Sequence, residues 1–395
     1  MPSSPEQEAA APPLSGLRVV DLSRVLAGPY AAMMLGDLGA DVVKIERPGA
    51  GDDTRMWGPP FVGPHDARES TYFLSTNRNK RSVALDLKDS GDLDRLRALI
   101  ADADVLIENF RGGVMERLGL GEERLLELNP RLVVLSITGF GHTGPDRERT
   151  GYDQILQAEG GLMSFTGPTA EQPTKVGVPI ADLVAGMLGA FGVLAALRER
   201  ELSGCGQVVR TSLLAGQLAI HAFQGTRWLV AGEVPGPAGN HHPTVCPYGM
   251  FPTADAPVVI AVGNDAIWAR FAPLVGLDAA DARYATNGER VAHREELEAA
   301  IEAALRERPV EAWMESFDAN GIPAGEVKTL DRVYGGEQVR ALGLVTEVEH
   351  ATLGRIRLPG PPLHFSRSPS RVHTAPPTLG QHTDEVTAAV AEASR

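Results

Sequence analysis

Short runs of aliphatic and β-branched residues alternate with helical patterns through the first 140 residues. The runs read LRVVDLS at 17–23, DVVKIE at 41–46, SVALDL at 82–87, DVLIENF at 104–110 and LVVLSITGF at 132–140. Strands that helices cover on both faces are apolar at nearly every position, and parallel strands need helical connections. The pattern therefore predicts an α/β fold whose large domain is built on a parallel sheet.

The rest of the chain contains a long helix, a second unit and a loop-rich tail. A helical run follows Asp182 and ends at Ser203-Gly204, a plausible C-terminal cap, and the strand-like QVVRTSLL comes next. Beyond a stretch dense in Pro and Gly, the strand-like VVIAVG and helical patterns at 265–275, 290–306 and 309–320 indicate a smaller α+β domain. The expected parts are a large domain at 14–215, a small domain at 225–325, a C-terminal segment at 330–395 and a disordered lead-in at 1–13.

Charge and cysteine content exclude several classes of protein. The net charge of −14 argues against a nucleic-acid partner, because phosphate binding needs a basic face. The two cysteines, Cys205 and Cys246, form neither a disulfide framework nor a metal site and indicate a reducing, cytoplasmic environment. The N-terminus does not resemble a secretory signal, and the apolar run at 183–197 is too short to span a bilayer, so no membrane segment is predicted.

Residues 19–52 have the layout of a Rossmann-like, dinucleotide-binding βαβ unit, although they lack its glycine fingerprint. A strand leads through Gly28-Pro29 into a helix, whose free N–H groups and dipole favour an anion, and then into a second strand. Arg47 follows that strand, 19 residues after Gly28, and suits the ribose phosphate of NADP or the 3′-phosphate of coenzyme A. Taken alone, Glu46-Arg47 is equally well interpreted as a solvated strand end.

Further basic residues lie near the ends of later predicted strands. They come from NRNKRSVALDLK and ENFRGGVMERLG and are Arg78, Lys80, Arg81, Lys88, Arg111 and Arg117. One such group is usually a solvated face. Several groups at strand ends favour a ligand, because open parallel sheets bind ligands outside their carboxyl ends.

In the order of its motifs the chain resembles the class III CoA-transferases, the CaiB/BaiF family typified by formyl-CoA transferase. The matching stretches are LSGLRVVDLSRVLAGPYAAMMLGDLGADVVKIERPGAGDDTR, NRNKRSVALDLK, ADVLIENFRGGVMERLGLG, LNPRLVVLSITGFG, GYDQILQAEGGLMSFTG, VGVPIADLVAGMLGAFGVLAALRERELSG and TLGQHTDEV. They run from residue 14 to 387, with a looser match over 220–330. The resemblance implies two protomers interlocked like links of a chain, each with a large domain to which the C-terminal segment returns.

The resemblance also implies a site for CoA or acyl-CoA as substrate. The family's contacts to CoA fall on Val25, Leu26, Ala27, Arg47, Leu85, Lys88, Asn109, Phe110 and Arg117. Of these, Arg47, Lys88 and Arg117 are also candidate anion ligands by their position after predicted strands.

The resemblance makes Asp182 the catalytic carboxylate. From the residues alone Asp182 is a helix N-cap, which typically contributes about 1 kcal/mol and needs no catalytic role. The two roles are compatible, because helix N–H donors would keep the carboxylate ionised, as a nucleophile requires. Gly160, Gly161 and Gly167 either allow backbone to approach a reacting acyl group or are ordinary turn glycines.

An enzyme of this family exchanges CoA through mixed anhydrides and an aspartyl-CoA thioester, so neither a metal nor a permanently bound cofactor is needed. Formyl-CoA transferase covers this centre with a glycine-rich loop, whereas this chain has Gly239-Asn240-His241-His242-Pro243, and no third metal ligand lies at useful spacing from the His pair. By family frequency we expect succinyl-CoA as donor and a small dicarboxylic acid as acceptor. Leu26, where formyl-CoA transferase has glutamine, does not favour oxalate.

Three other functions remain open from the sequence. The 2-methylacyl-CoA racemases of the same family use a Gly-His-Asp motif, which is Gly151-Tyr152-Asp153 here, and tyrosine is a poor base with its ordinary pKa of about 10. His142 lies nearby but at a different place in the motif. An NADP dehydrogenase and a non-catalytic acyl-CoA-binding protein are the remaining alternatives.

Overall fold

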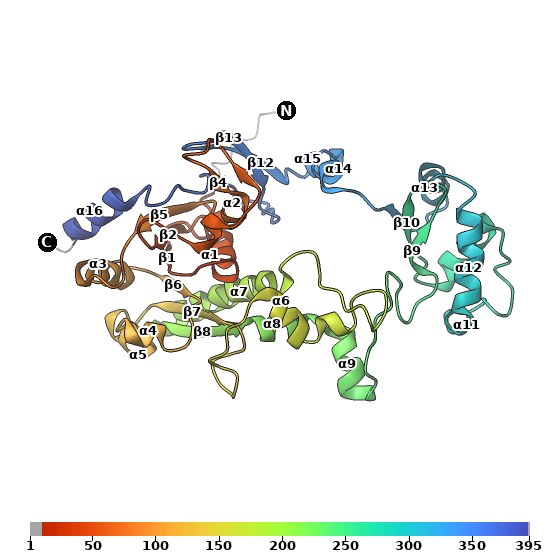
Figure 1. Cartoon of the computed structure of the whole chain (residues 1–395), viewed down its shortest axis with the longest axis horizontal. Helices are drawn as coiled ribbons and strands as arrows, with labels where there is room; N and C mark the ends of the chain where they lie inside the picture. The colour runs from red at the N-terminus through yellow and green to blue at the C-terminus, as the bar shows by residue number, and fades with distance from the viewer. Residues whose placement is uncertain (1–9, 394–395) are drawn as a thin grey trace, which may run out of the picture. The chain divides into compact units, whose positions relative to one another are not determined.

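The computed structural model describes residues 10–393, and the contacts within the chain divide it into two compact units (Figure 1). The first unit comprises residues up to 162, 176–230 and 337 onward, and the second comprises 163–175 and 231–336. Residues 163–175 thus group with the small unit, although the expected large domain of 14–215 included them. Most of the predicted lead-in, residues 1–9, lies outside the described residues.

A six-stranded parallel sheet forms the centre of the first unit. Its order is β5-β2-β1-β6-β7-β8, and every neighbouring pair is parallel. The strands are β1 (Arg18–Asp21), β2 (Asp41–Glu46), β5 (Lys80–Ala84), β6 (Val105–Glu108), β7 (Val133–Thr138) and β8 (Gln207–Ser212). The predicted α/β class and the parallel sheet are confirmed.

Alternate residues of each strand face two separate helical layers. Val19 and Val105 belong to one hydrophobic cluster, whereas Val20 and Leu106, their neighbours along the chain, belong to another. The first layer contains α1 (Ala27–Asp37) and α7 (Ile180–Ser203), and the second contains α3 (Ser90–Ala101) and α16 (Thr383–Ala393). Because helices cover both faces of the sheet, neither face is left open to solvent along its length, as the sequence pattern indicated.

The C-terminal segment is tied to the first unit by hydrogen bonds near the start of β5. The side chain of Asn79 accepts the backbone N–H of His373 at 2.8 Å, and the backbone N–H of His382 donates to the oxygen of Ser82 at 2.9 Å. The helix α16 then packs on α3 and β5. Residues more than 290 positions apart in sequence therefore share one layer.

The smaller elements of the first unit form the loops and covers around the sheet. They are η1 (Asp53–Met56), β3 (Phe61–Val62), β4 (Glu69–Ser70), α2 (Thr71–Thr76), α4 (Val114–Arg117), α5 (Glu122–Leu128), α6 (Asp153–Glu159), α8 (Leu213–Ile220), α9 (Ala222–Ala231), α15 (Glu337–Ala341), β12 (Val345–His350) and β13 (Gly354–Pro359), with η2 (Leu162–Ser164) at the boundary of the two units. The predicted strand QVVRTSLL ends at Ser212, because the Ser212 hydroxyl accepts the N–H of Ala215 and starts α8.

The second unit has its own antiparallel sheet and its own aromatic core. Trp268, Phe251 and Phe317 are almost fully buried in that core. The sheet order is β11 (Ala324–Glu326), β10 (Pro257–Ala261), β9 (Tyr248–Pro252), and the helices are α10 (Asp265–Phe271), η3 (Ala272–Val275), α11 (Asn287–Ala292), α12 (Arg294–Leu305), α13 (Val310–Ala319) and α14 (Leu330–Tyr334). The helix predicted at 290–306 is broken at His293, so that α11 and α12 are separate.

Candidate active site

The helix α7, which carries Asp182, packs closely against α1 because it has a glycine at the crossing. A Cβ atom at Gly186 would lie 2.6 Å from the backbone oxygen of Ala27. Gly189 and Gly192 allow a similarly close fit against side chains of β7 and β8. Asp182 lies four residues before Gly186 and therefore on the same face of the helix. The glycine spacing thus places Asp182 beside the loop that precedes α1.

Asp182 is not the N-cap of α7. The helix begins at Ile180, so Asp182 is its third residue. The N-cap position is occupied by Pro179, whose side chain makes no capping hydrogen bond. The N–H of Ala181 instead donates to the Oδ1 atom of Asp153 on α6, at 2.8 Å. The prediction that Asp182 caps the helix is wrong, because a carboxylate from another helix satisfies the free N–H.

The Asp182 carboxylate makes no hydrogen bond or ion pair with residues 10–393. Burial, followed by the negative charge of Asp153, raises the pKa of Asp182 to about 7. The expectation that helix N–H groups keep this carboxylate ionised is therefore wrong, because the pKa of Asp182 is raised and not lowered. An unpaired carboxylate that is half ionised at neutral pH is available for covalent or proton-transfer chemistry.

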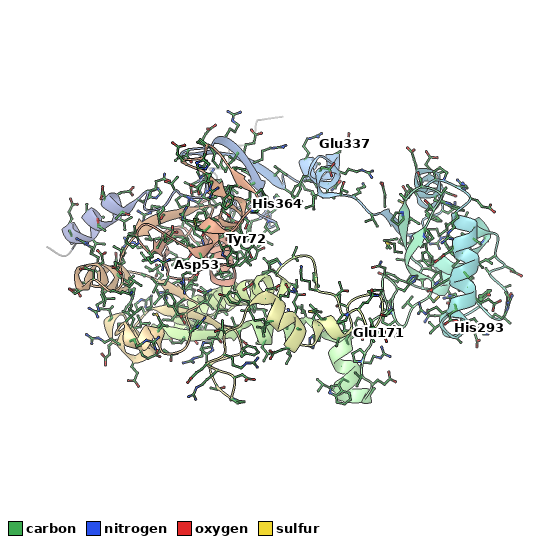
Figure 2. All side chains as sticks on the ribbon, viewed as in Figure 1. Asp53, Tyr72, Glu171, His293, Glu337 and His364 are labelled. Atoms are coloured by element: carbon green, nitrogen blue, oxygen red, sulfur yellow. The ribbon has the colours of Figure 1, made fainter. Side chains whose placement is uncertain are left out.

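Tyr72 on α2 lies close enough to Asp182 for their charges to interact. Burial, then Asp182 and then Asp153 raise the pKa of Tyr72 to about 12. Figure 2 labels Tyr72 and Asp53 within the first unit. A tyrosine that stays protonated beside a reacting carboxylate can donate a hydrogen bond to a developing oxyanion. Tyr72 was not singled out from the sequence, and Asp153 was named only as part of the racemase-like triplet, because no local pattern marks either residue as a neighbour of Asp182.

Asp182 lines a cavity of about 140 Å³ at the carboxyl ends of β1, β6 and β7. The two ends of the loop that follows β7 meet beside this cavity at Gly139 and Gly151. Neither position has room for a side chain, since a Cβ at Gly139 would lie 2.6 Å from the Cα of Gly151. Pockets for drug-sized ligands occupy roughly 300–1,000 Å³. The volume beside Asp182 therefore suits a small acid or acyl group.

A larger cavity of about 390 Å³ lies beyond the carboxyl ends of β5, β2, β1 and β6, and it includes the point between β1 and β6 where the winding of the sheet reverses. Doubly wound sheets bind nucleotides in this crevice. Four predicted site residues line the cavity, namely Arg47, Leu85, Lys88 and Phe110. The side chains of Arg47 and Lys88 are exposed, and neither forms an ion pair within the described part of the chain. Both are therefore available to an anionic ligand.

The two cavities share a wall. Arg24, Phe110 and Arg111 line both of them. Asn109, which follows β6, is hydrogen-bonded to the loop that follows β1. Its side chain accepts a hydrogen bond from the backbone N–H of Arg24 at 2.8 Å and donates one to the backbone oxygen of Arg24 at 2.7 Å. A ligand that reaches from the large cavity to Asp182 would therefore pass loops whose positions are coupled.

Of the remaining predicted contacts, two line the Asp182 cavity and two line neither cavity. Val25 and Ala27 line the Asp182 cavity, whereas Leu26 is buried and lines neither cavity. Arg117 is exposed on α4 and is not part of either lining, although Val114 and Leu118 of the same segment are.

Three of the basic residues singled out from the sequence hold the fold together and are not free for a ligand. Arg78, Lys80 and Arg81 are each paired with an aspartate. The partners are Asp37, Asp21 and Asp41, at 2.6, 3.0 and 2.6 Å. From the sequence, these charges were interpreted as ligands near the carboxyl ends of strands. The three residues instead lie before or in the first two positions of β5, at its amino end.

The candidate glycines and histidines do not surround Asp182. Gly160 and Gly161 do not line its cavity, and Gly167 belongs to the second unit. None of the residues that line the cavity is a histidine. His142 hydrogen-bonds to Ser136 at 2.9 Å beside a separate cavity of about 80 Å³. The geometry therefore lacks the His–Asp pair that a racemase of this kind needs.

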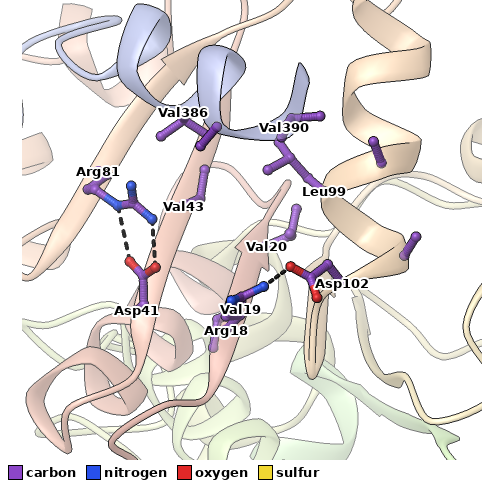
Figure 3. A pocket seen from close by; sticks show the side chains of 13 residues that line it. Arg18, Val19, Val20, Asp41, Val43, Arg81, Leu99, Asp102, Val386 and Val390 are labelled. Atoms are coloured by element: carbon purple, nitrogen blue, oxygen red, sulfur yellow. Dashed lines mark hydrogen bonds and ion pairs between the residues drawn. The ribbon is translucent and has the colours of Figure 1, made fainter. Parts of the chain in front are cut away.

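Another cavity, of about 620 Å³, lies elsewhere (Figure 3). It is formed by α3, α16 and the amino ends of β1 and β2. Its arginines are already paired, Arg81 with Asp41 and Arg18 with Asp102. No predicted site residue lines it, and nucleotides bind at the opposite ends of such strands.

Comparison with known proteins agrees with this location of the site. The model of CoA-transferase family III matches residues 14–383. The chain belongs to CoA-transferase family III. The resemblance deduced from the motifs is thereby confirmed, and the chain is an enzyme that transfers CoA, rather than the dehydrogenase or the binding protein that were also considered.

Named relatives of this CoA-transferase cover nearly its whole length. It is 39% identical to human succinyl-CoA:glutarate CoA-transferase over 95% of this chain and 85% of that protein. It is 42% identical to succinate–glutarate CoA-transferase of Agrobacterium fabrum over 95% of both proteins. The crystal structure of a CaiB/BaiF family protein from Brucella suis has a TM-score of 0.87 and 37% identity, and covers 96% of this chain and 100% of that one.

Proposed function

We propose that this enzyme transfers CoA from succinyl-CoA to a small dicarboxylic acid such as glutarate, with Asp182 as the nucleophile. The observation that carries the proposal is an unpaired carboxylate with a pKa near 7 in a small cavity, which shares a wall with a larger cavity at the switch point of the sheet. The names of the human and Agrobacterium relatives support the donor and the acceptor.

The proposed reaction conserves the thioester in four balanced steps. The Asp182 carboxylate attacks the thioester carbonyl of succinyl-CoA, a C–O bond forms, and CoA leaves as thiolate. The thiolate attacks the Asp182 carbonyl of the mixed anhydride, which releases succinate and leaves an aspartyl-CoA thioester. The acceptor carboxylate attacks that thioester and expels the thiolate again. The thiolate then attacks the acceptor acyl carbon, which yields the new acyl-CoA and regenerates the Asp182 carboxylate.

Tyr72 is the group that we place at the developing oxyanions. Its raised pKa keeps the phenol protonated at neutral pH, and after burial the charge of Asp182 contributes most to that shift. A fixed donor near the reacting carbonyl stabilises negative charge more in a buried site than in water. CoA enters as a substrate, and the sequence of steps requires no bound cofactor and no metal.

CoA is placed with its nucleotide in the larger cavity. Arg47 and Lys88 are its phosphate ligands in this proposal, because both are exposed, unpaired and part of the lining. The pantetheine would pass the loop at 25–27 and the segment at 109–110 toward Asp182. Leu85 contributes the apolar floor, and Arg117 is a further contact by family resemblance.

A homodimer is the proposed assembly, interlocked as the family resemblance implies. Phe191, Trp228 and Leu229 of the first unit are 71%, 54% and 82% exposed, and α9 has no buried residue in the described chain. A second copy would cover such apolar side chains. The helix α7 extends beyond the apolar run at 183–197 and by length and composition could cross a membrane, so the expectation that it is too short was wrong; half of its apolar window is buried inside the protein, as in the core helix of a globular domain. Light scattering that gives a monomer at micromolar concentration would contradict the dimer.

The compartment that we propose is the cytoplasm. Both cysteines are free, Cys205 exposed and Cys246 buried, which suits a reducing environment. No membrane or nucleic-acid partner is included in the proposal.

The function is tested by crossing acyl-CoA donors with carboxylic acids and measuring products by mass spectrometry. Succinyl-CoA with glutarate should give glutaryl-CoA and succinate, and oxalate should be a poorer acceptor. Asp182→Asn is the matched control, because the amide has nearly the same shape and no attacking oxygen anion. The absence of any product with succinyl-CoA and a panel of mono- and dicarboxylic acids would refute the proposal.

A further inference from the structure

The loop between β1 and α1 has a backbone shape that valine rarely adopts. Val25 has φ = +70°, in the left-handed region, which is strongly unfavourable for a β-branched side chain. Such a conformation persists only where the surroundings determine it, and it is often found at functional sites. Val25 lines the Asp182 cavity, so the shape of this loop affects what the cavity can accept.

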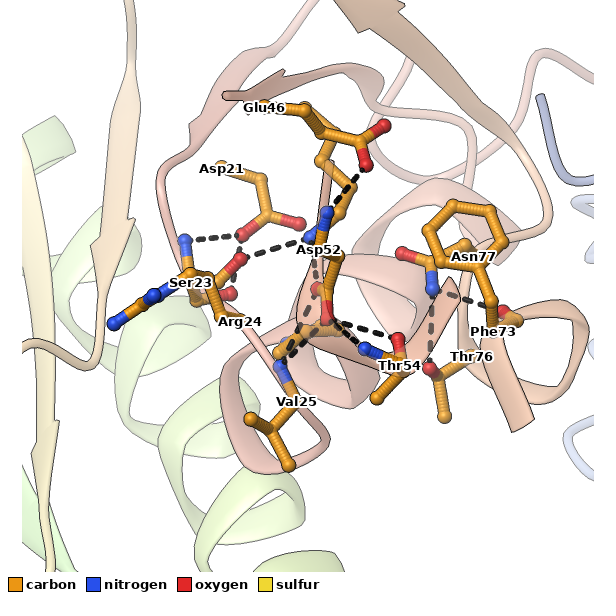
Figure 4. A network of polar contacts seen from close by, with 12 residues as sticks. Asp21, Ser23, Arg24, Val25, Glu46, Asp52, Thr54, Phe73, Thr76 and Asn77 are labelled. Carbon is orange, nitrogen blue, oxygen red and sulfur yellow. Dashed lines mark hydrogen bonds and ion pairs between the residues drawn. The ribbon is translucent and has the colours of Figure 1, made fainter. Parts of the chain in front are cut away.

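A buried ion pair lies directly beneath this loop. The Nζ atom of Lys44 is 2.9 Å from the Oδ2 atom of Asp52, and both side chains are fully buried. Lys44 also donates to the backbone oxygen of Ser23 at 2.8 Å, and Asp52 accepts the backbone N–H of Val25 at 3.2 Å. The pair therefore holds the loop at both sides of Arg24. Figure 4 shows Asp52 beside Val25.

Other contacts fix the pair itself. Thr54 donates to the Oδ1 atom of Asp52 from its backbone N–H at 2.9 Å and from its hydroxyl at 2.8 Å. Asp21 accepts the backbone N–H of Ser23 at 3.0 Å and is paired with the buried Lys80. Four buried charged side chains therefore lie beneath the loop, and they form two ion pairs, Lys44 with Asp52 and Lys80 with Asp21.

Stability alone does not explain such an arrangement. Buried ion pairs are often no more stabilising than apolar residues of the same volume, because desolvation opposes their attraction. What apolar side chains could not supply are the two directed hydrogen bonds to Ser23 and Val25. These bonds are the contacts through which the pair determines the shape of the loop.

We propose that Lys44 and Asp52 are positioning residues, which hold the loop at Ser23–Val25 in place, with Val25 left-handed, before CoA binds. The inference rests on the proposed function in one respect, namely that this loop contacts CoA. Both residues also belong to the wall of the larger cavity, but their side chains are fully buried, and their hydrogen bonds to Ser23 and Val25 are the contacts through which they act on the loop.

The main test is the double variant Lys44→Met/Asp52→Asn, which removes both charges together and leaves neither uncompensated. The KM for succinyl-CoA should rise about tenfold to a hundredfold, with kcat within about threefold of wild type, as expected when binding is lost equally from ground and transition states. Hydrogen exchange of the amides at 23–27 should be faster in the ligand-free variant than in wild type. The single variant Thr54→Val removes the hydroxyl that donates to Asp52 and leaves the buried charges paired; it should show a smaller change in the same direction and serves if the double variant does not fold.

The matched control removes another buried pair that does not contact the loop. Arg78→Met/Asp37→Asn deletes an ion pair whose side chains are each 5% exposed. The control should lower the melting temperature without changing the KM for succinyl-CoA or exchange at 23–27. Equal increases in KM for both double variants, or unchanged KM and exchange in the Lys44/Asp52 and Thr54 variants, would overturn the positioning role.

A separate measurement distinguishes this inference from the proposed function. CoA added to the wild-type enzyme should slow hydrogen exchange at 23–27. If CoA does not protect this segment while the variants still loosen it, the assignment of the loop to CoA is wrong and the structural hold on it stands. If CoA protects the segment and the variants do not loosen it, the CoA assignment stands and the positioning role fails.

Discussion

Replacing Asp182 by asparagine should make the protein more stable and nearly inactive at the same time. The folded state raises the pKa of this carboxyl from 3.8 to about 7 through burial and the charge of Asp153. The folded protein therefore binds more protons than the unfolded chain between about pH 4 and 7. Over that window the wild type loses stability as the pH rises, because ionised Asp182 is unfavourable only in the folded state.

The size of the effect follows from the pKa shift. A shift from 3.8 to about 7 is about 3 units, and at about 1.4 kcal/mol per unit it corresponds to an upper bound of about 4 kcal/mol. Asp182 is partly exposed, so solvent screening reduces this to about 1–3 kcal/mol. Asparagine carries no charge and should recover this amount above pH 7 and almost none of it below pH 4.

The assay is urea unfolding of wild type and Asp182→Asn at pH 4 and pH 8, at equal protein concentration, together with turnover at pH 8. The difference in unfolding free energy should grow with pH by about 1–3 kcal/mol, and turnover should fall by at least about a thousandfold. A difference that is the same at both pH values would show that the pKa of Asp182 is not raised. Turnover near the wild-type rate would show that Asp182 is not the nucleophile.

The remaining predictions test the neighbours of Asp182. Asp153→Asn keeps an oxygen for the first N–H groups of α7 and removes a like charge, so the pKa of Asp182 should fall; the rise of kcat/KM with pH should then begin at lower pH, and an unchanged profile would contradict the coupling. Arg47→Ala should weaken CoA binding by about 1.5–3 kcal/mol in calorimetry. Its melting temperature should not change, because the side chain is exposed. Unchanged affinity would show that Arg47 is a solvated residue at the end of the strand and not a CoA ligand. Gly186→Ala should destabilise the protein by about 1–3 kcal/mol in urea, because its Cβ would overlap the backbone of α1, whereas Gly177→Ala, where a Cβ meets nothing within 4 Å, should not.

The elements of the fold could be read from local patterns. The strands at 17–23, 41–46, 104–110 and 132–140 were visible because burial on both faces makes a strand apolar along its length. The end of α7 at Ser203 was visible because Gly204 adopts φ = +79°, which glycine accepts at little cost. Such signals depend on a few neighbouring residues, and for this reason they survive without knowledge of the rest of the chain.

The chemistry of the site depended on residues that are distant in sequence. Lys80 looked like a ligand until β5 placed it beside Asp21, 59 positions away, in a fully buried pair. Asp182 looked like an N-cap until α6 brought Asp153 to the free N–H of α7, 28 positions away.

By itself the sequence determined the family, the parallel sheet, the candidate nucleophile and the arginine at the switch point. The parallel sheet and the arginine after its second strand follow from residue type and local spacing, whereas the family and the role of Asp182 follow from the resemblance that the ordered motifs carry. Only the tertiary structure decided which basic side chains remain unpaired, which carboxylate caps α7 and in which direction the pKa of Asp182 moves. Pairing and pKa depend on desolvation and on charges within a few ångströms, and these are properties of the packed chain that no run of neighbouring residues specifies.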